Sequence, residues 1–220
     1  MKALVVGGTP SAGKSRTILW LTSVHEGLGR VGVAKLDCLR TTDDTLFRSR
    51  GIPATRLLAG RFCPDHAWME RLPEVREWAL ARELETLLVE TAGLCARCAP
   101  YLDDALALCV LDCTGGIHGP SKLGPLLADA DVCVLTKGDL VSQAEREVFS
   151  LNVRSKNPRA ALVTLNGLTG EGSRDLVRAL DSLSWGRLSA DVAESAPRTP
   201  LPQMYCSYCF GRSEVGITSL

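Results

Sequence analysis

The chain has 220 residues, of which 45% are hydrophobic, enough for one well-buried domain with a short appendage. Its 25 basic residues balance 25 acidic ones, which argues against a nucleic-acid groove or an anionic membrane surface as the main partner. No run approaches the length of a membrane span, and the apolar N-terminus is too short for a signal peptide. We therefore expect a soluble, cytoplasmic protein.

A phosphate-binding loop follows the first expected strand. Residues 3–6 are apolar and predict a strand, and residues 14–27 predict a helix. Gly-Thr-Pro-Ser-Ala-Gly-Lys-Ser at 8–15 joins them and has the full Walker A pattern. The backbone N–H groups of such a loop wrap a polyphosphate, its lysine reaches the terminal phosphates, and its hydroxyl holds Mg²⁺. The nucleotide-binding residues expected here are Gly8, Gly13, Lys14, Ser15 and Arg16, with Lys14 also catalytic.

Two aspartates follow the second expected strand, residues 32–36. Asp37 ends that strand, and Asp43 stands in a polar stretch where a phosphate-sensing switch loop would lie. One carboxylate could position Mg²⁺ or its waters and the other the attacking water. We therefore assign catalysis to both and Mg²⁺ binding to Asp37 together with Ser15. The alternative is that Asp43 or Asp44 only caps the next helix.

Cys63 and His66 stand at the start of the next expected helix, residues 66–83. The intervening Pro64 suits a first helical turn, which leaves the thiolate and the imidazole at neighbouring positions. Two soft ligands at this spacing predict a transition-metal site.

A carboxylate and a flexible glycine follow the next expected strand, residues 86–90. Glu90 ends that strand and would stand beside the γ-phosphate as a catalytic carboxylate. Gly93 could offer its N–H to the same phosphate. A bound nucleoside triphosphate would then pull on the segment that carries Cys95 and Cys98. The sequence therefore predicts that nucleotide state is coupled to these thiols.

The strand expected at 132–135 leads into Thr-Lys-Gly-Asp, where a nucleotide base would lie. Asp139 can accept hydrogen bonds from guanine N1–H and N2–H₂, a donor pair that adenine lacks, and the Lys137 stem can cover the ring. Asn166 and Gly167 begin a loop that could close over the base with backbone groups. The combination favours GTP over ATP.

The remaining apolar stretches complete a regular alternation of strands and helices. Strands without polar alternation are typical of a sheet buried on both faces. We therefore expect an α/β fold of the P-loop NTPase kind, with a mostly parallel central sheet and helices on both faces. The expected strands are 3–6, 32–36, 86–90, 107–111, 132–135 and 161–165, and the expected helices are 14–27, 66–83, 142–152 and 172–182.

The chain is expected to divide near residue 184. Residues 1–184 form the predicted GTPase domain, and residues 185–220 form a linker with mixed polar composition and then a short C-x-x-C finger. Cys206 and Cys209 carry that finger.

Nine cysteines stand in a chain with intracellular signatures, so disulfides are not expected. The pairs Cys95/Cys98 and Cys206/Cys209 have the C-x-x-C spacing of soft-metal ligation or thiol chemistry. Three others, Cys109, Cys113 and Cys133, lie in or at the end of apolar strand-like runs and are expected in the core.

Residues 2–182 resemble a known family, the SIMIBI-class GTPases that serve metal centres. This class includes the nickel-insertion GTPase of hydrogenase maturation, the urease accessory GTPase and the cobalamin-synthesis-type metal GTPases. The loop at 8–15 is similar to theirs, and Asp37 and Asp43 match their two switch-loop aspartates. The segments 59–66 and 90–95 resemble their Cys-His and Glu-x-x-Gly segments.

The resemblance implies a homodimer closed by GTP, with Cys63, His66 and Cys95 of both subunits binding Ni²⁺ or Zn²⁺ across the interface. Hydrolysis would then release the ion to an acceptor metalloenzyme or an accessory maturation protein. The chain departs from the family in three places. Two residues separate Cys63 from His66, Cys98 is an additional thiol, and the tail carries its own C-x-x-C.

Two other interpretations of the thiols stay open. In one, Cys95 and Cys98 hold a [4Fe-4S] cluster, one pair per subunit or joined by Cys206 and Cys209, and pass the cluster or electrons to a target enzyme. In the other, the tail pair is a structural zinc knuckle or docking finger. The guanine signature favours the metal-delivery function over the iron–sulfur one.

Overall fold

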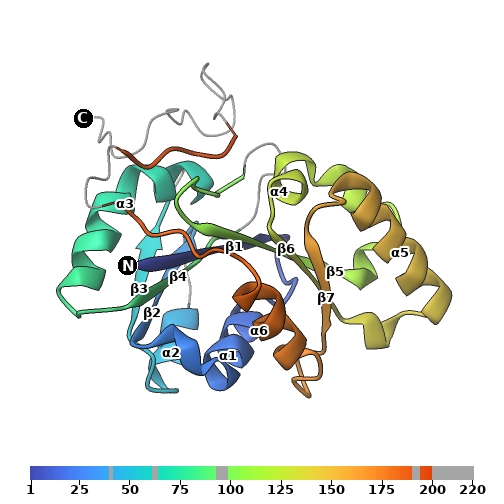
Figure 1. Ribbon diagram of the computed structural model, residues 1–220, viewed down its shortest axis with the longest axis horizontal. Helices are drawn as coiled ribbons and strands as arrows, with labels where there is room; N and C mark the ends of the chain where they lie inside the picture. Colours follow the sequence, from blue (N-terminus) through green and yellow to red (C-terminus); the bar gives the residue numbers. More distant parts are fainter. Residues whose placement is uncertain (40–41, 61–63, 93–98, 190–193, 200–220) are drawn as a thin grey trace.

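The computed structural model describes residues 1–39, 42–60, 64–92, 99–189 and 194–199. Its centre is a seven-stranded sheet in the order β3-β2-β4-β1-β5-β6-β7, and every strand pairing in it is parallel (Figure 1). The strands are β1 (Lys2–Gly8), β2 (Val31–Asp37), β3 (Ala54–Leu58), β4 (Thr86–Glu90), β5 (Leu106–Asp112), β6 (Val132–Thr136) and β7 (Ala161–Leu165). The helices are α1 (Lys14–Val24), α2 (Asp43–Arg48), α3 (Pro64–Leu80), α4 (Gly124–Ala128), α5 (Gln143–Lys156) and α6 (Ser173–Asp181).

Helices cover both faces of the sheet and bury a separate apolar core on each. Ile18 of α1, Phe47 of α2 and Leu176 of α6 pack against one face. Trp68 of α3 and Phe149 of α5 belong to the core of the other face. Figure 1 shows α3 and α4 above the sheet and α5 at its right. The predicted α/β architecture is therefore confirmed.

The boundaries differ from expectation in a few places. The edge strand β3 was not predicted, because its exposed Arg56 and Leu58 break the apolar run that marks the central strands. The first helix ends at Val24 rather than residue 27, and a short 3₁₀ turn, Glu26–Leu28, follows it. His25 caps that turn, since its Nδ1 accepts a hydrogen bond from Gly27 N–H at 3.1 Å.

Cys109, Cys113 and Cys133 lie in the core, as expected. Burial raises the pKa of the Cys133 thiol to about 12 and that of Cys113 to about 11. Burial also raises the pKa of Cys109 well above its ordinary value. These three side chains are neutral apolar fillers and not ligands or nucleophiles.

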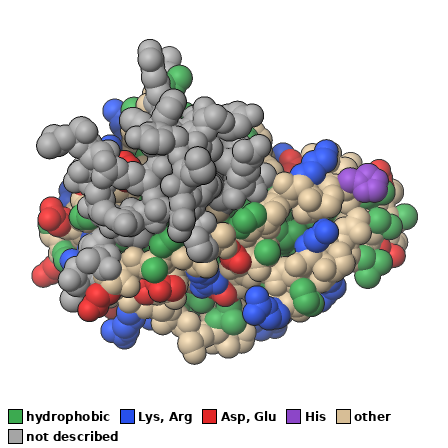
Figure 2. Space-filling model, turned by 90° about the horizontal axis from the view of Figure 1, so that it is seen from above, with side chains coloured by type: hydrophobic (Ala, Val, Ile, Leu, Met, Phe, Trp, Pro, Cys, Tyr) green, Lys and Arg blue, Asp and Glu red, His purple; other side chains and the backbone are tan. Residues whose placement is uncertain are grey.

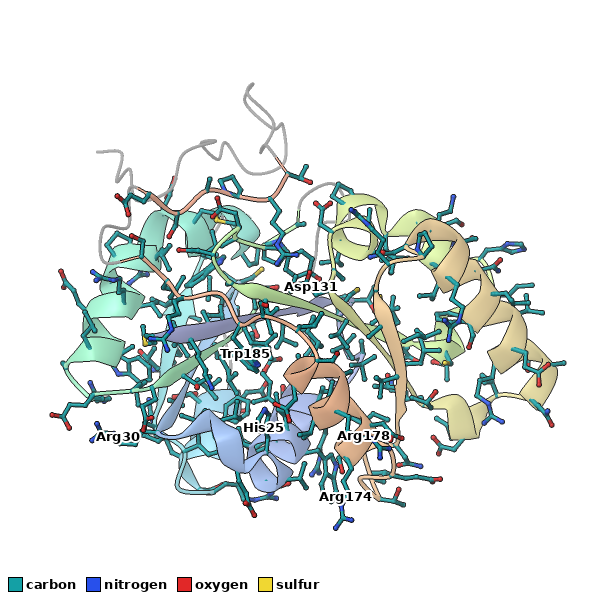
Figure 3. All side chains as sticks on the ribbon, viewed as in Figure 1. His25, Arg30, Asp131, Arg174, Arg178 and Trp185 are labelled. Carbon is teal, nitrogen blue, oxygen red and sulfur yellow. The ribbon has the colours of Figure 1, made fainter. Side chains whose placement is uncertain are left out.

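Parts of the segment expected to be a linker are bound to the domain. Trp185 returns to the end of α1, where its ring meets His25 edge-on at 6.2 Å (Figure 3). Further on, Pro197 forms an antiparallel bridge with Leu102. The Arg198 guanidinium donates to the carbonyls of Leu102, Ala105 and Asp129 and forms an ion pair with Asp131 at 2.7 Å. The proposed domain boundary near residue 184 stays a prediction.

Among the described residues, no helix combines the length and the apolar character that crossing a lipid bilayer requires. Acidic and basic side chains both appear on the described part of the face in Figure 2, as expected from the neutral net charge.

Candidate nucleotide site

The Walker A loop leaves the central strand β1 and enters α1 through two glycines with positive φ. Gly8 has φ 142°, and a Cβ there would lie 2.3 Å from the Val110 carbonyl oxygen. Gly13 has φ 94° and is the N-cap of α1. Only glycine adopts these conformations without strain, so the loop shape depends on both positions.

Lys14 lies at the centre of this loop, with 5% of its surface exposed. Its Nζ donates to the carbonyls of Gly8 at 3.0 Å and Thr9 at 2.8 Å. A third, longer contact of 3.4 Å reaches the carbonyl of Ala92, just beyond β4. The lysine thus connects the loop to the strand end that leads toward Gly93.

Ser15 Oγ stands between two carboxylates from distant parts of the chain. It lies 3.0 Å from Asp43 Oδ2 and 2.9 Å from Glu90 Oε1. A hydroxyl has one proton and can donate to only one of these oxygens at a time. One hydroxyl and two carboxylates form the hard-oxygen set that suits Mg²⁺.

Glu90 is 1% exposed, and burial raises the pKa of its carboxyl, which Lys35, Lys14 and Ser15 offset only in part. Among the described residues, its Oε2 atom has no hydrogen-bond partner. A buried carboxylate oxygen without a partner is costly in free energy, so this atom is suited to a cation or to a water held by one. The donor set therefore fits Mg²⁺.

Lys35 of β2 also contacts this set, and sequence reasoning missed it. Its Nζ lies 2.5 Å from Glu90 Oε1 and 3.1 Å from Asp43 Oδ2. Burial lowers the pKa of Lys35, but the two carboxylates raise it more, so the ammonium stays charged. The sequence did contain a clue to this role, because Lys35 interrupts the apolar residues of the strand Val-Gly-Val-Ala-Lys-Leu-Asp.

The two predicted switch aspartates have different positions. Asp43 is the first residue of α2 and contacts Ser15, whereas the described hydrogen bond of Asp37 is local, from Cys38 N–H at 2.8 Å. In the described contacts Ser15 therefore meets Asp43 and Glu90 rather than Asp37. The Mg²⁺ role expected for Ser15 and Asp37 stays a prediction. The alternative capping role is also not seen, because Thr42 occupies the N-cap and Asp44 pairs with Arg48.

A cavity of about 370 Å³ brings these groups together at the carboxyl ends of β1, β2 and β4. Arg16 and Asp37 reach it as well, so the expected phosphate-site residues share one space. The cavity is lined by Pro10, Ser11, Gly13, Lys14, Ser15, Arg16, Lys35, Asp37, Asp43, Glu90 and Ala92.

A second cavity, of about 260 Å³, lies beside the ends of β6 and β7. Asp139 and Asn166 both line it, so the two segments predicted to hold a base do meet. The Asn166 side chain accepts from Leu168 N–H at 2.9 Å and so shapes its own loop. Gly167 offers its carbonyl to the Trp20 indole N–H at 3.0 Å, which ties the loop to α1.

Lys137 directly precedes Gly138, which lines this cavity. It has φ 56°, and its Nζ lies 2.5 Å from Asp112 Oδ2 of β5. The preceding Thr136 hydroxyl donates to the Ala12 carbonyl of the Walker A loop at 2.6 Å. The base-side segment and the phosphate loop are therefore directly joined.

The predicted soft-metal ligands lie outside the described residues: Cys63, Cys95, Cys98, Cys206, Cys209 and the side chain of His66. Gly93, predicted to bind the γ-phosphate, lies outside them as well. Within the part of the chain that is described, no three His, Cys, Asp or Glu side chains cluster to hold an ion.

The fold and the two cavities define a P-loop nucleotide-binding domain built on an all-parallel sheet. The family follows from the sequence, because residues 2–164 match the family described as CobW/HypB/UreG, nucleotide-binding domain. The chain belongs to this family, which confirms the resemblance inferred from the motifs.

Among curated proteins, the chain is 40% identical over 217 residues to the uncharacterized protein MJ0120 of Methanocaldococcus jannaschii, covering 98% of this chain and 91% of the relative. It is 28% identical over 202 residues to the hydrogenase maturation factor HypB of Azotobacter vinelandii, covering 87% of this chain. The match spans 64% of that protein's length.

Solved structures show the same fold. HypB from Archaeoglobus fulgidus has a TM-score of 0.64 and 20% identity, covering 83% of this chain and 89% of that one. HypB from Helicobacter pylori, solved in complex with nickel, has a TM-score of 0.65 and 15% identity, covering 83% and 86% of the two chains.

Proposed function

We propose that the protein is a GTP-hydrolysing metallochaperone that dimerises with GTP and delivers nickel or zinc during maturation of a metalloenzyme. The observation that carries this proposal is the hydrogen bond from Thr136 to Ala12, which joins the loop of the Walker A cavity to the segment that leads into the cavity containing Asp139. Two relatives support nickel as the transported ion, since one is named a hydrogenase maturation factor and another was solved in complex with nickel.

The proposed hydrolysis depends on charge and position. Lys14 would neutralise the terminal phosphates, while Ser15, Asp43 and Glu90 would hold Mg²⁺, which supplies charge stabilisation to the transferring phosphoryl group. Asp37 lines the same cavity and is free of the Ser15 contact, so we assign it to orienting the attacking water. Asp139 would select guanine.

Coupling between nucleotide and cargo would act through the end of β4. Ala92 contacts Lys14, and Gly93 and Cys95 follow it in the chain. A γ-phosphate that recruits Lys14 and the Gly93 N–H would change the strain on this segment. Cys95, with Cys63 and His66, is the proposed ligand set for the transported ion, in a site shared between two subunits.

The test is anaerobic purification followed by metal analysis, a visible spectrum and sizing, each with and without a non-hydrolysable GTP analogue. We expect about one nickel or zinc per dimer, bound more tightly with the analogue. Cys63→Ser should abolish this binding, and Cys38→Ser, which removes a thiol outside the ligand set, should not. Iron and sulfide in equal amounts with broad visible absorption would overturn the proposal in favour of a cluster protein.

A further inference from the structure

Lys35 occupies an unusual position for a lysine. Strands β2 and β4 pair in parallel with Lys35 opposite Glu90, so both side chains reach the same cavity at the carboxyl ends of the strands. Lys35 is 5% exposed. Burial of an ammonium is strongly unfavourable unless carboxylates compensate its charge. The buried Lys35 ammonium therefore depends on the ion pair with Glu90.

The Lys35 ammonium contacts the same two oxygens that surround the Ser15 hydroxyl. Asp43 Oδ2 lies 3.0 Å from Ser15 Oγ and 3.1 Å from Lys35 Nζ. Glu90 Oε1 lies 2.9 Å from Ser15 Oγ and 2.5 Å from Lys35 Nζ. The ammonium therefore sits where it neutralises the two carboxylates that fit Mg²⁺.

Mg²⁺ and this ammonium are incompatible at the shared oxygens. Mg²⁺ binds oxygen at about 2.0–2.1 Å in octahedral geometry, and a second cation on the same oxygen atoms would be repelled. The Glu90 Oε2 atom, buried and without a partner among the described residues, remains available as the carboxylate turns. Lys35 lines the cavity that also contains Lys14, so a displaced ammonium stays beside the phosphate loop.

We propose that Lys35 is an internal counter-ion that holds the Asp43–Glu90 pair until Mg²⁺ displaces it, and that the displaced ammonium then binds the γ-phosphate of GTP. Binding of Mg²⁺ and engagement of a second phosphate-binding lysine are thereby one event. This inference rests on the proposed nucleotide site and is independent of the transported metal.

The first experiment uses nucleotide-free protein with Mn²⁺ as a spectroscopic substitute for Mg²⁺. Removal of the competing ammonium in Lys35→Met should strengthen Mn²⁺ binding, measured by electron paramagnetic resonance, about tenfold or more. Arg56→Met is the matched control, because Arg56 is the exposed β3 residue in register with Lys35 and should leave Mn²⁺ affinity unchanged. Equal or weaker Mn²⁺ binding by a folded Lys35→Met protein would overturn the competition.

The second experiment compares GTP with GDP in the presence of Mg²⁺. Because the released lysine would contact the γ-phosphate, which GDP lacks, Lys35→Met should weaken GTP binding about tenfold while changing GDP binding little. If Lys35→Met lost affinity for GTP and GDP equally, Lys35 would not bind the γ-phosphate. A wild-type protein that binds neither nucleotide would instead overturn the proposed function, while the nucleotide-free Mn²⁺ comparison would still decide the competition.

A third measurement needs no variant, should Lys35→Met fail to fold. Nuclear magnetic resonance of ¹⁵N-labelled lysine ammonium groups follows the wild-type protein as Mg²⁺ is added. The Lys35 signal should shift with Mg²⁺ occupancy, and the exposed Lys122 should serve as the unaffected reference. A Lys35 signal that does not respond while Mg²⁺ binds would contradict the displacement.

Discussion

Lys137 and Asp112 join the carboxyl ends of β6 and β5, with Nζ 2.5 Å from Oδ2. Burial alone would raise the pKa of Asp112, but Lys137 and Thr114 lower it more, and the net pKa lies below the ordinary value. The carboxylate therefore stays charged and holds the lysine in place at the proposed base site.

The first prediction concerns this pair. Asp112→Asn should weaken GDP and GTP binding about threefold to fivefold, because the Lys137 stem loses its anchor while Asp139 is untouched. Isothermal titration calorimetry measures the change. Glu147→Gln on the exposed side of α5 should bind like wild type, and an Asp112→Asn protein with unaltered affinity would show that the anchor is dispensable.

The second prediction concerns base choice. Asp139→Asn replaces two acceptor oxygens with an amide, so guanine loses a charge-assisted pair and GTP affinity should fall about 10- to 100-fold. Xanthine presents a carbonyl where guanine has an amine, so xanthosine triphosphate should gain affinity. Competition binding with both nucleotides decides this. Retained guanine preference in the variant would place base recognition elsewhere.

The third prediction uses Trp20 as a reporter, since its indole N–H donates to the Gly167 carbonyl of the base-side loop. Guanine nucleotide should change the tryptophan fluorescence of the wild type. Trp20→Phe should abolish the change, whereas Trp78→Phe, on the opposite face of the sheet, should retain it. A response of equal size in the Trp20→Phe protein would assign the signal to another tryptophan.

The fourth prediction tests the attachment of residues 194–199. Arg198→Ala removes the hydrogen bonds to the carbonyls of Leu102, Ala105 and Asp129 and the ion pair with Asp131, which Figure 3 labels. The free energy of unfolding in urea should fall by about 2–4 kcal/mol. The exposed Arg187, changed to Ala, provides the control, with an expected loss within about 0.5 kcal/mol. A similar decrease in the free energy of unfolding for both variants would show that Arg198 does not anchor this segment.

The fifth prediction concerns alkaline pH. The Cys133 thiol has a pKa of about 12 in the folded chain against 9.0 ordinarily. Between these values the unfolded thiol ionises while the folded one stays protonated, so the free energy of unfolding falls by about 1.4 kcal/mol per pH unit. Urea unfolding at pH 8 and pH 10 should show a smaller decrease for Cys133→Ala than for wild type. The same decrease in both would mean that Cys133 does not contribute.

The sequence predicted the central strands because they are buried on both faces, and their apolar runs report that burial directly. Strands 86–90 and 161–165 were predicted to the residue. Of the two edge strands, β7 has four apolar residues in five and was predicted, whereas β3 was missed because Thr55 and Arg56 interrupt its apolar residues.

The candidate site was predictable as a set of residues but not as a set of contacts. Walker A and Thr-Lys-Gly-Asp are local patterns with a fixed geometry, so Lys14, Ser15 and Asp139 could be assigned. The contact between Lys35 and Glu90 joins residues 55 positions apart and depends on strand register. The placement of α2, which begins at Asp43, likewise brings Asp43 rather than Asp37 to Ser15, and no motif spacing predicts that placement.

The two cavities are built from different parts of the chain, which are synthesised one after the other. The lining of the phosphate cavity lies within residues 10–92, whereas the base-side cavity is built from residues 138–175. A growing chain that folds from its N-terminus therefore completes the groups for phosphate well before those that recognise guanine. Each parallel pairing also requires a long crossover, which slows assembly of the sheet. A nascent chain should thus acquire affinity for polyphosphates first and selectivity for their base only when β6 and β7 have joined the sheet.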